Sequence, residues 1–172
     1  MLNELISIVW FLLPAAFANM APVIFNRTDF LNKPINSKLF GSHKTYRGFF
    51  FGILLSIFVI FIQELFSGFL EGYLLINYSP SFELMFIGVI LGFSALLGDL
   101  VKSFFKRRRK IKPGQSWIPF DQIDWVLMVL IFSIFIVKLN FWHFFFAIAT
   151  YSFLNILINK ISFTFNIRDT KI

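Results

Sequence analysis

The 172-residue chain contains no cysteine, which excludes disulfides, thiolate metal sites and cysteine nucleophiles. Charge is also scarce, because 15% of the residues are charged and 58% are hydrophobic, against about 25% and 45–50% in soluble domains. A single globular core cannot bury this much apolar surface, so the composition indicates a protein embedded in a bilayer. The net charge of +7 could indicate nucleic-acid binding. However, the basic residues lie in short segments between apolar runs, as in membrane proteins, so we expect no nucleic-acid partner.

The N-terminus lacks a positive charge ahead of its first apolar run. A secretory signal peptide needs such a charge, so we interpret Ala16-Phe17-Ala18, which resembles a cleavage site, as part of a retained helix. Pro14 and Pro22 predict that this first span is kinked or partly re-entrant. A kink frees backbone carbonyls that lipid cannot satisfy, so residues 18–22 are expected to face the protein interior.

Apolar runs predict five membrane helices, at about residues 5–25, 48–66, 82–97, 121–137 and 141–158. Segments 26–47 and 102–112 carry five and seven Lys and Arg residues and the tail carries three, whereas the N-terminus and segment 67–81 carry none. The positive-inside rule then places the N-terminus outside and the C-terminus and two basic loops in the cytoplasm. We therefore expect an all-α integral membrane protein, one domain over residues 1–172, in the cell membrane. The sequence does not indicate its oligomeric state.

The third predicted span carries two features on its helix. Gly88 and Gly92 have the small-x-x-x-small spacing that lets a neighbouring helix approach closely. Asp99 is followed one helical turn later by Lys102 and Ser103, and two turns later by Lys106 and Arg107. Such a stripe can hold Mg²⁺ on the carboxylate and phosphate oxygens on the cations. Alternatively, Asp99 only pairs with Lys102, and the basic run is a topology signal attracted to anionic headgroups.

Asp121 and Asp124 begin the fourth predicted span at i, i+3 spacing and so point to one side of a helix. One interpretation is structural: Asp121 is an N-cap and Asp124 a favourable first-turn acid. The other is that both acids join Asp99 to hold one or two Mg²⁺ ions, with seven basic residues, Lys112 included, close by. That combination suits a reaction at a phosphate.

Segment 41–48, Gly-Ser-His-Lys-Thr-Tyr-Arg-Gly, precedes the second predicted helix. Its Lys, Thr and Arg side chains and the following helix N-terminus can donate hydrogen bonds to an anion. The spacing of a Walker loop is absent, and a plain basic loop is the alternative. His43 and His143 show no metal-binding spacing, and His143 is expected to be an interfacial polar residue.

These residues together resemble a known signature. The pattern shared with CTP-dependent phosphatidate cytidylyltransferases comprises Gly98-Asp99-Leu100, Ser103, Lys106-Arg107, Lys112, Pro119, Asp121 and Asp124. The short branch of that superfamily, the CDP-archaeol synthases, is more similar. It resembles the chain in Ala18-Asn19-x-x-Pro22, Lys44-Thr45-Tyr46-Arg47-Gly48, Ser103 to Arg108 and Pro119 to Asp124. Residues 115–118 lack the Gly- and His-rich turn of the larger branch, and Arg47 replaces its Glu, which also favours the short branch.

The resemblance implies an enzyme that joins CTP to a lipid phosphate, 2,3-bis-O-geranylgeranylglyceryl phosphate, and releases a CDP-lipid and pyrophosphate at the cytoplasmic face. It implies Mg²⁺ bound by the catalytic residues Asp99, Asp121 and Asp124. The nucleotide and phosphate would be bound by Lys44, Thr45, Arg47, Gly48, Lys102, Ser103, Lys106, Arg107 and Lys112. Asn19 and Pro22 would be structural or would line the substrate. Alternatives are the same reaction on a diacyl or other lipid phosphate, or a non-catalytic scaffold or transporter. Transport is disfavoured because the charges cluster at one face instead of at the midplane.

Overall fold

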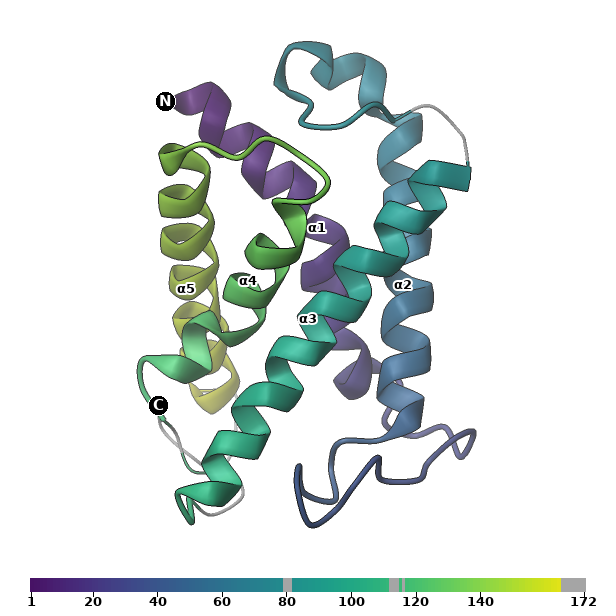
Figure 1. Cartoon of the computed structure of the whole chain (residues 1–172), viewed down its shortest axis with the longest axis vertical. Coiled ribbons are helices and arrows are strands. Elements are labelled where there is room, and N and C mark those ends of the chain that lie inside the picture. The colour runs from purple at the N-terminus through teal and green to yellow at the C-terminus, as the bar shows by residue number, and fades with distance from the viewer. Residues whose placement is uncertain (79–81, 112–114, 116, 165–172) are drawn as a thin grey trace.

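The protein is a bundle of helices that run alternately up and down its long axis (Figure 1). The computed structural model describes residues 1–78, 82–111, 115 and 117–164, without the side chains of residues 158–164. Its elements are α1 (Leu2–Ile24), α2 (Tyr46–Leu65), the 3₁₀-helix η1 (Ser67–Tyr73), α3 (Phe82–Arg108), α4 (Phe120–Ser133) and α5 (Phe141–Thr164). The loop before α2, the end of α3 and the start of α4 therefore lie at one end of the bundle, and the N-terminus and η1 lie at the other.

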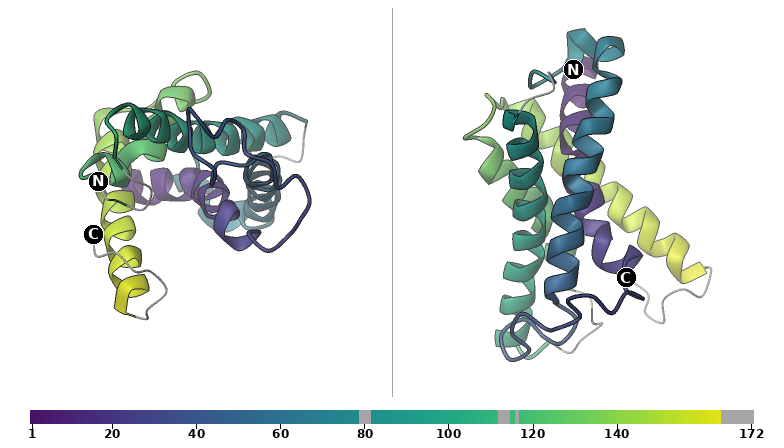
Figure 2. Two further views of the ribbon diagram at one scale, coloured as in Figure 1. Left: turned by 90° about the horizontal axis from the view of Figure 1, so that it is seen from below. Right: turned by 90° about the vertical axis from the view of Figure 1, so that its right-hand side faces the viewer.

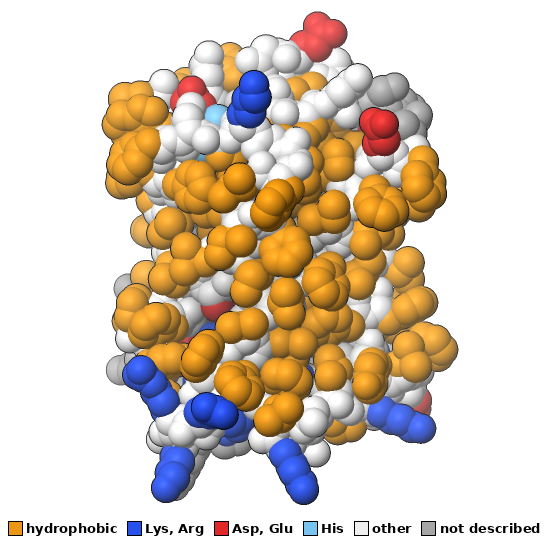
Figure 3. Space-filling model, viewed as in Figure 1, with side chains coloured by type: hydrophobic (Ala, Val, Ile, Leu, Met, Phe, Trp, Pro, Cys, Tyr) orange, Lys and Arg blue, Asp and Glu red, His pale blue; other side chains and the backbone are white. Residues whose placement is uncertain are grey.

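Three helices, α1, α2 and α3, are long and apolar enough to cross a membrane. The all-helical integral membrane class is therefore supported. In contrast, α4 has 14 residues, and the apolar part of α5 whose side chains are described is Phe141–Leu157, so the count of five spans and the orientation remain predictions. On the face seen in Figure 3, apolar side chains form a broad belt, and most of the visible Lys and Arg side chains gather at one end.

The first helix differs from one expectation. Pro14 and Pro22 both lie inside α1, which continues as one helix from Leu2 to Ile24, so the re-entrant alternative is wrong. Of residues 18–22, which were expected to face the interior, Ala18 and Ala21 are fully buried, whereas Met20 is 48% exposed, so the expectation holds for one side of the helix.

The third and fourth helices have boundaries that the apolar pattern misplaced. α3 continues eleven residues past its predicted end at 97 and includes the basic run up to Arg108. The second basic loop is thus mainly the end of a helix. Hydropathy falls at this point, but residues 99–112 contain no Gly or Pro, and Lys and Arg are good helix formers. α4 ends at Ser133 instead of 137, because the backbone tightens into i→i+3 hydrogen bonds such as Phe135 N to Phe132 O.

Small residues set the helix separations. A Cβ on Gly88 would lie 3.1 Å from the Cα of Ile57, and a Cβ on Gly92 would lie 3.2 Å from the Cα of Ile53, so α2 approaches α3 as closely as the glycine spacing predicted. At Gly98 the neighbour is α4, and a Cβ there would lie 2.8 Å from the Cα of Trp125. The close approach at Gly98 positions the site described next.

Candidate active site

Three aspartates and three lysines converge where α3 meets α4, at the end of the bundle that holds the basic residues. Gly98 lets the two helices touch, so the carboxylates of Asp99 on α3 and Asp124 on α4 lie on either side of one ammonium group, that of Lys102. The geometry thereby brings together three acids that the sequence separates by up to 25 residues.

Lys102 is the centre of this cluster. Its Nζ atom lies 3.1 Å from Asp99 Oδ1, 2.7 Å from Asp124 Oδ2 and 3.7 Å from Asp121 Oδ1. The side chain of Asp124 is only 5% exposed, and its Oδ1 atom has no hydrogen-bond partner among the described residues. A buried carboxylate oxygen without a donor is costly, so this position favours an additional cation or donor.

Asp121 fixes the entry to α4. Its carboxylate accepts a 2.5 Å hydrogen bond from the backbone N–H of Trp117 and lies 3.1 Å from Lys106 Nζ. Lys106 also donates to the backbone oxygen of Gln115. The helix begins at Phe120 with Pro119 as N-cap, so Asp121 is not the N-cap that the structural interpretation assumed. The Lys106–Asp121 pair instead ties the end of α3 to the first turn of α4.

Lys44 reaches the cluster from the loop before α2 and forms an ion pair with Asp99, 55 residues away in sequence. The loop is folded back on itself: Ile35 N donates to Lys44 O at 2.8 Å, and the buried Arg47 guanidinium donates to Thr28 O. Thr45 caps α2, since its Oγ1 accepts from Gly48 N at 3.3 Å. Of the basic residues predicted in this segment, Lys44 faces the acids, whereas Arg47 orders the loop that carries it.

A small cavity of about 20 Å³ opens beside the Lys44–Asp99 pair. Its walls are Pro22, His43, Lys44, Thr45, Gly48, Phe49, Leu96 and Asp99. Pro22 thus lies at the site and packs against Gly48. Sequence reasoning missed His43, Phe49 and Leu96. The position of His43 next to Lys44 was its only signal.

The other residues that the sequence assigned to the site lie at different distances from the acid–lysine cluster, and one of them is not described. The hydroxyl of Ser103 donates to the Asp99 backbone oxygen at 2.8 Å, on its own helix. Arg107 lies beside Gly41 of the loop, with its buried Nε lacking a partner among the described residues. Asn19 is half-buried on α1, and Lys112 lies outside the described residues.

Within residues 1–78, 82–111, 115 and 117–157, no three His, Asp or Glu side chains form a ready-made metal cage. The donor chemistry nevertheless fits a magnesium ion. Three carboxylates converge on one point, at least one of their buried oxygens lacks a hydrogen bond, and Mg²⁺ is commonly held by one or two carboxylates plus waters and substrate phosphates. The ammonium of Lys102 stands at that point.

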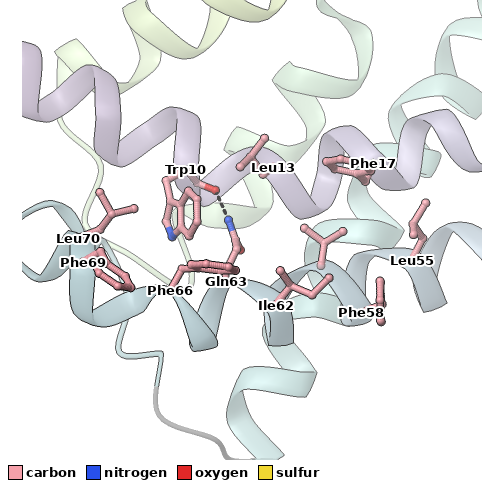
Figure 4. A pocket seen from close by; sticks show the side chains of 11 residues that line it. Trp10, Leu13, Phe17, Leu55, Phe58, Ile62, Gln63, Phe66, Phe69 and Leu70 are labelled. Atoms are coloured by element: carbon pink, nitrogen blue, oxygen red, sulfur yellow. Dashed lines mark hydrogen bonds between the residues drawn. The ribbon is translucent and has the colours of Figure 1, made fainter.

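At the opposite end of the bundle, an ion pair and a hydrogen bond connect neighbouring helices. His143 Nε2 lies 2.5 Å from Glu4 Oε2 and joins α5 to α1, so His143 is a buried structural residue instead of an interfacial one. A groove of about 560 Å³ between α1, α2 and η1 is shown in Figure 4, where Gln63 donates to the backbone oxygen of Trp10. Apart from Gln63, apolar side chains line it.

An apolar helical bundle with an acid–lysine cluster at one end is the arrangement expected of a membrane-embedded enzyme that acts on phosphates. The comparisons agree: residues 1–172 match the family described as "CarS-like: CDP-archaeol synthase", and the chain belongs to that family. It is therefore a CTP-dependent lipid cytidylyltransferase, and the scaffold and transporter alternatives are set aside.

Relatives extend over most of the chain. CDP-archaeol synthase of Methanocaldococcus jannaschii is 30% identical over 169 residues, covering 96% of each chain. Those of Pyrococcus furiosus and Methanococcus maripaludis are 31% and 35% identical, and the matches cover 77% and 75% of each chain. A solved structure of an intramembrane enzyme for archaeal membrane lipids biosynthesis superposes with a TM-score of 0.70 and 25% identity, over 88% of this chain and 91% of that one.

Proposed function

We propose that the protein transfers the cytidylyl group of CTP to 2,3-bis-O-geranylgeranylglyceryl phosphate and releases pyrophosphate. A bond forms between the lipid phosphate oxygen and the α-phosphorus of CTP, and the bond from that phosphorus to the oxygen bridging to the β-phosphorus breaks. The observation that carries the proposal is the convergence of Asp99, Asp121 and Asp124 with Lys44, Lys102 and Lys106 at one end of an apolar bundle.

The lysines supply the anion-binding half of the site. The attacking phosphate oxygen is already ionised near neutral pH, so the main obstacle is repulsion between two anions and no strong base is required. Lys102 at the centre of the cluster and Lys44 and Lys106 beside it bind oxygens of the triphosphate and of the lipid phosphate. Arg107 extends this basic surface, and Lys112 stays a phosphate-binding residue predicted from the sequence. Thr45, Gly48 and Arg47 hold the loop that presents Lys44, and Ser103 lies behind Asp99.

The aspartates supply the cation-binding half. Asp99, Asp121 and Asp124 hold Mg²⁺, which when bound neutralises phosphate charge and polarises the α-phosphoryl group. The buried Asp124 is the strongest candidate ligand, because one of its oxygens has no other partner.

The lipid chains lie against the apolar belt. The site is at one end of the bundle, where a headgroup in the bilayer and a nucleotide in water can meet. We further propose five membrane spans in the cell membrane, with the site at the cytoplasmic face, because the loop before α2 and the basic end of α3 share that end.

Pyrophosphate release from CTP tests the reaction, with detergent-solubilised protein, Mg²⁺ and a panel of lipid phosphates. Rapid release with the geranylgeranyl ether lipid and slow release with diacyl phosphatidate supports the proposal. Equal or faster release with the diacyl lipid contradicts the assigned lipid, and no release with any lipid contradicts the reaction itself. Reporter fusions at residues 75 and 110 test the orientation, which predicts that only the second reports cytoplasm.

A further inference from the structure

We infer that the ammonium of Lys102 is an internal counter-ion that occupies the place of the metal in the nucleotide-free enzyme and leaves it when metal and nucleotide bind. This rests on the proposed metal-dependent function. It goes further by assigning one residue a positioning role toward the metal, in addition to phosphate binding.

The first argument is position. Lys102 is the only lysine of the cluster that approaches all three carboxylates within 4 Å, whereas among the described contacts Lys44 pairs with Asp99 and Lys106 with Asp121. A cation bridging oxygens from Asp99 and Asp124 would have to stand close to the site of this ammonium. The two cations cannot share the position, because they would repel each other strongly in a poorly solvated site.

The second argument is charge. With Lys102 in place, three ammonium groups face three carboxylates, so the cluster is neutral without any ligand. Removing Lys102 would leave three negative charges against two positive ones, around the 5% exposed Asp124 side chain. Buried carboxylates that lose a partner are strongly destabilising, so such a protein needs a replacement cation.

The third argument is the mobility of the Lys102 side chain. Lys102 carries its ammonium on a flexible four-carbon stem in the last two turns of α3, so the ammonium can swing to a phosphate without moving the helix. The incoming phosphate then receives the ammonium that the metal displaces. Metal and nucleotide binding are therefore coupled, and each lowers the cost of binding the other.

The role of Lys102 is tested by measuring, in the absence of nucleotide, how tightly the protein binds a metal ion and how much that ion raises its Tm. We expect Lys102→Met to bind Mn²⁺, followed by electron paramagnetic resonance, at least about tenfold more tightly than the unchanged protein. Its Tm should also rise by several degrees on adding Mg²⁺ in place of EDTA, whereas the unchanged protein should respond weakly.

Lys106→Met is the matched control. It removes one positive charge from the same cluster, but not the charge that lies between the three carboxylates. An equal gain in Mn²⁺ affinity in this control would show a general charge effect and overturn the inference. No gain in Lys102→Met would overturn it as well. If Lys102→Met does not fold, Lys102→Gln keeps a hydrogen-bonding group without the charge and carries the same expectations.

Failure of the proposed metal-dependent function can be distinguished from failure of the counter-ion role. If the unchanged protein, in the presence of CTP and lipid phosphate, shows neither Mn²⁺ binding nor Mg²⁺-dependent turnover, the metal assignment itself is wrong. If it shows both while Lys102→Met binds Mn²⁺ no more tightly, only the counter-ion role is wrong.

Discussion

Gly98 on α3 lies so close to α4 that a Cβ added to it would be 2.7 Å from the backbone oxygen of Asp124. The contact joins the two helices that carry all three aspartates of the site. The absence of one side chain therefore sets the distance between Asp99 and Asp124.

Gly98→Ala should push α3 and α4 apart. Because the nearest atoms are backbone atoms that cannot rotate away, we expect destabilisation of about 1–3 kcal/mol and a clear fall in turnover. Thermal unfolding and pyrophosphate release measure the two effects. Gly72→Ala is the control, since a Cβ on Gly72 meets nothing within 4 Å. A Gly98→Ala protein with unchanged Tm and turnover would contradict the close packing.

Asp99→Asn, Asp121→Asn and Asp124→Asn each remove a carboxylate charge while keeping the shape of the side chain. If the three hold the metal, each change should lower kcat by about 100-fold or more. Glu83→Gln, in the first turn of the same α3 but at the other end of the bundle, should keep its rate. Full activity in all three aspartate variants would move the site elsewhere.

Lys44→Met tests the contribution of the loop before α2. Its ammonium is the part of that loop that pairs with Asp99, and a lost charge-assisted contact to phosphate should raise the KM for CTP by about tenfold or more. Lys38→Met, at an exposed position on the same loop, serves as the comparison. Equal effects of the two changes on KM would indicate a general attraction of the nucleotide to a basic surface.

Thr45 is expected to act on stability through its side-chain oxygen. Thr45→Ala removes the acceptor for Gly48 N at the start of α2 and should cost about 1 kcal/mol in unfolding free energy. Thr45→Ser keeps the hydroxyl and should unfold within a degree or two of the original Tm. If the Ala variant is as stable as the Ser variant but binds CTP more weakly, the hydroxyl contacts the nucleotide instead.

Several features could be predicted from the sequence because their causes are local. The apolar runs located α2 within two residues at each end, and the glycine spacing on α3 predicted its close contact with α2. The i, i+3 spacing placed Asp121 and Asp124 on the same side, and both approach Lys102. Boundaries were misplaced where hydropathy and helix propensity diverge, as in the basic end of α3, which is polar but helical up to Arg108.

The sequence by itself determined that this chain lies in a membrane, that its acids and lysines suit phosphate chemistry, and that it resembles a cytidylyltransferase family. Composition and spacing carry these properties without reference to distant contacts. Only the tertiary structure decided which charges are partners: Lys44 with Asp99 across 55 residues, Lys102 with all three aspartates, and Arg47 with the loop backbone instead of the acids. An ion pair depends on separations of a few ångströms, and here those separations are set by how closely α3 and α4 pack at Gly98 and by how the loop before α2 folds back.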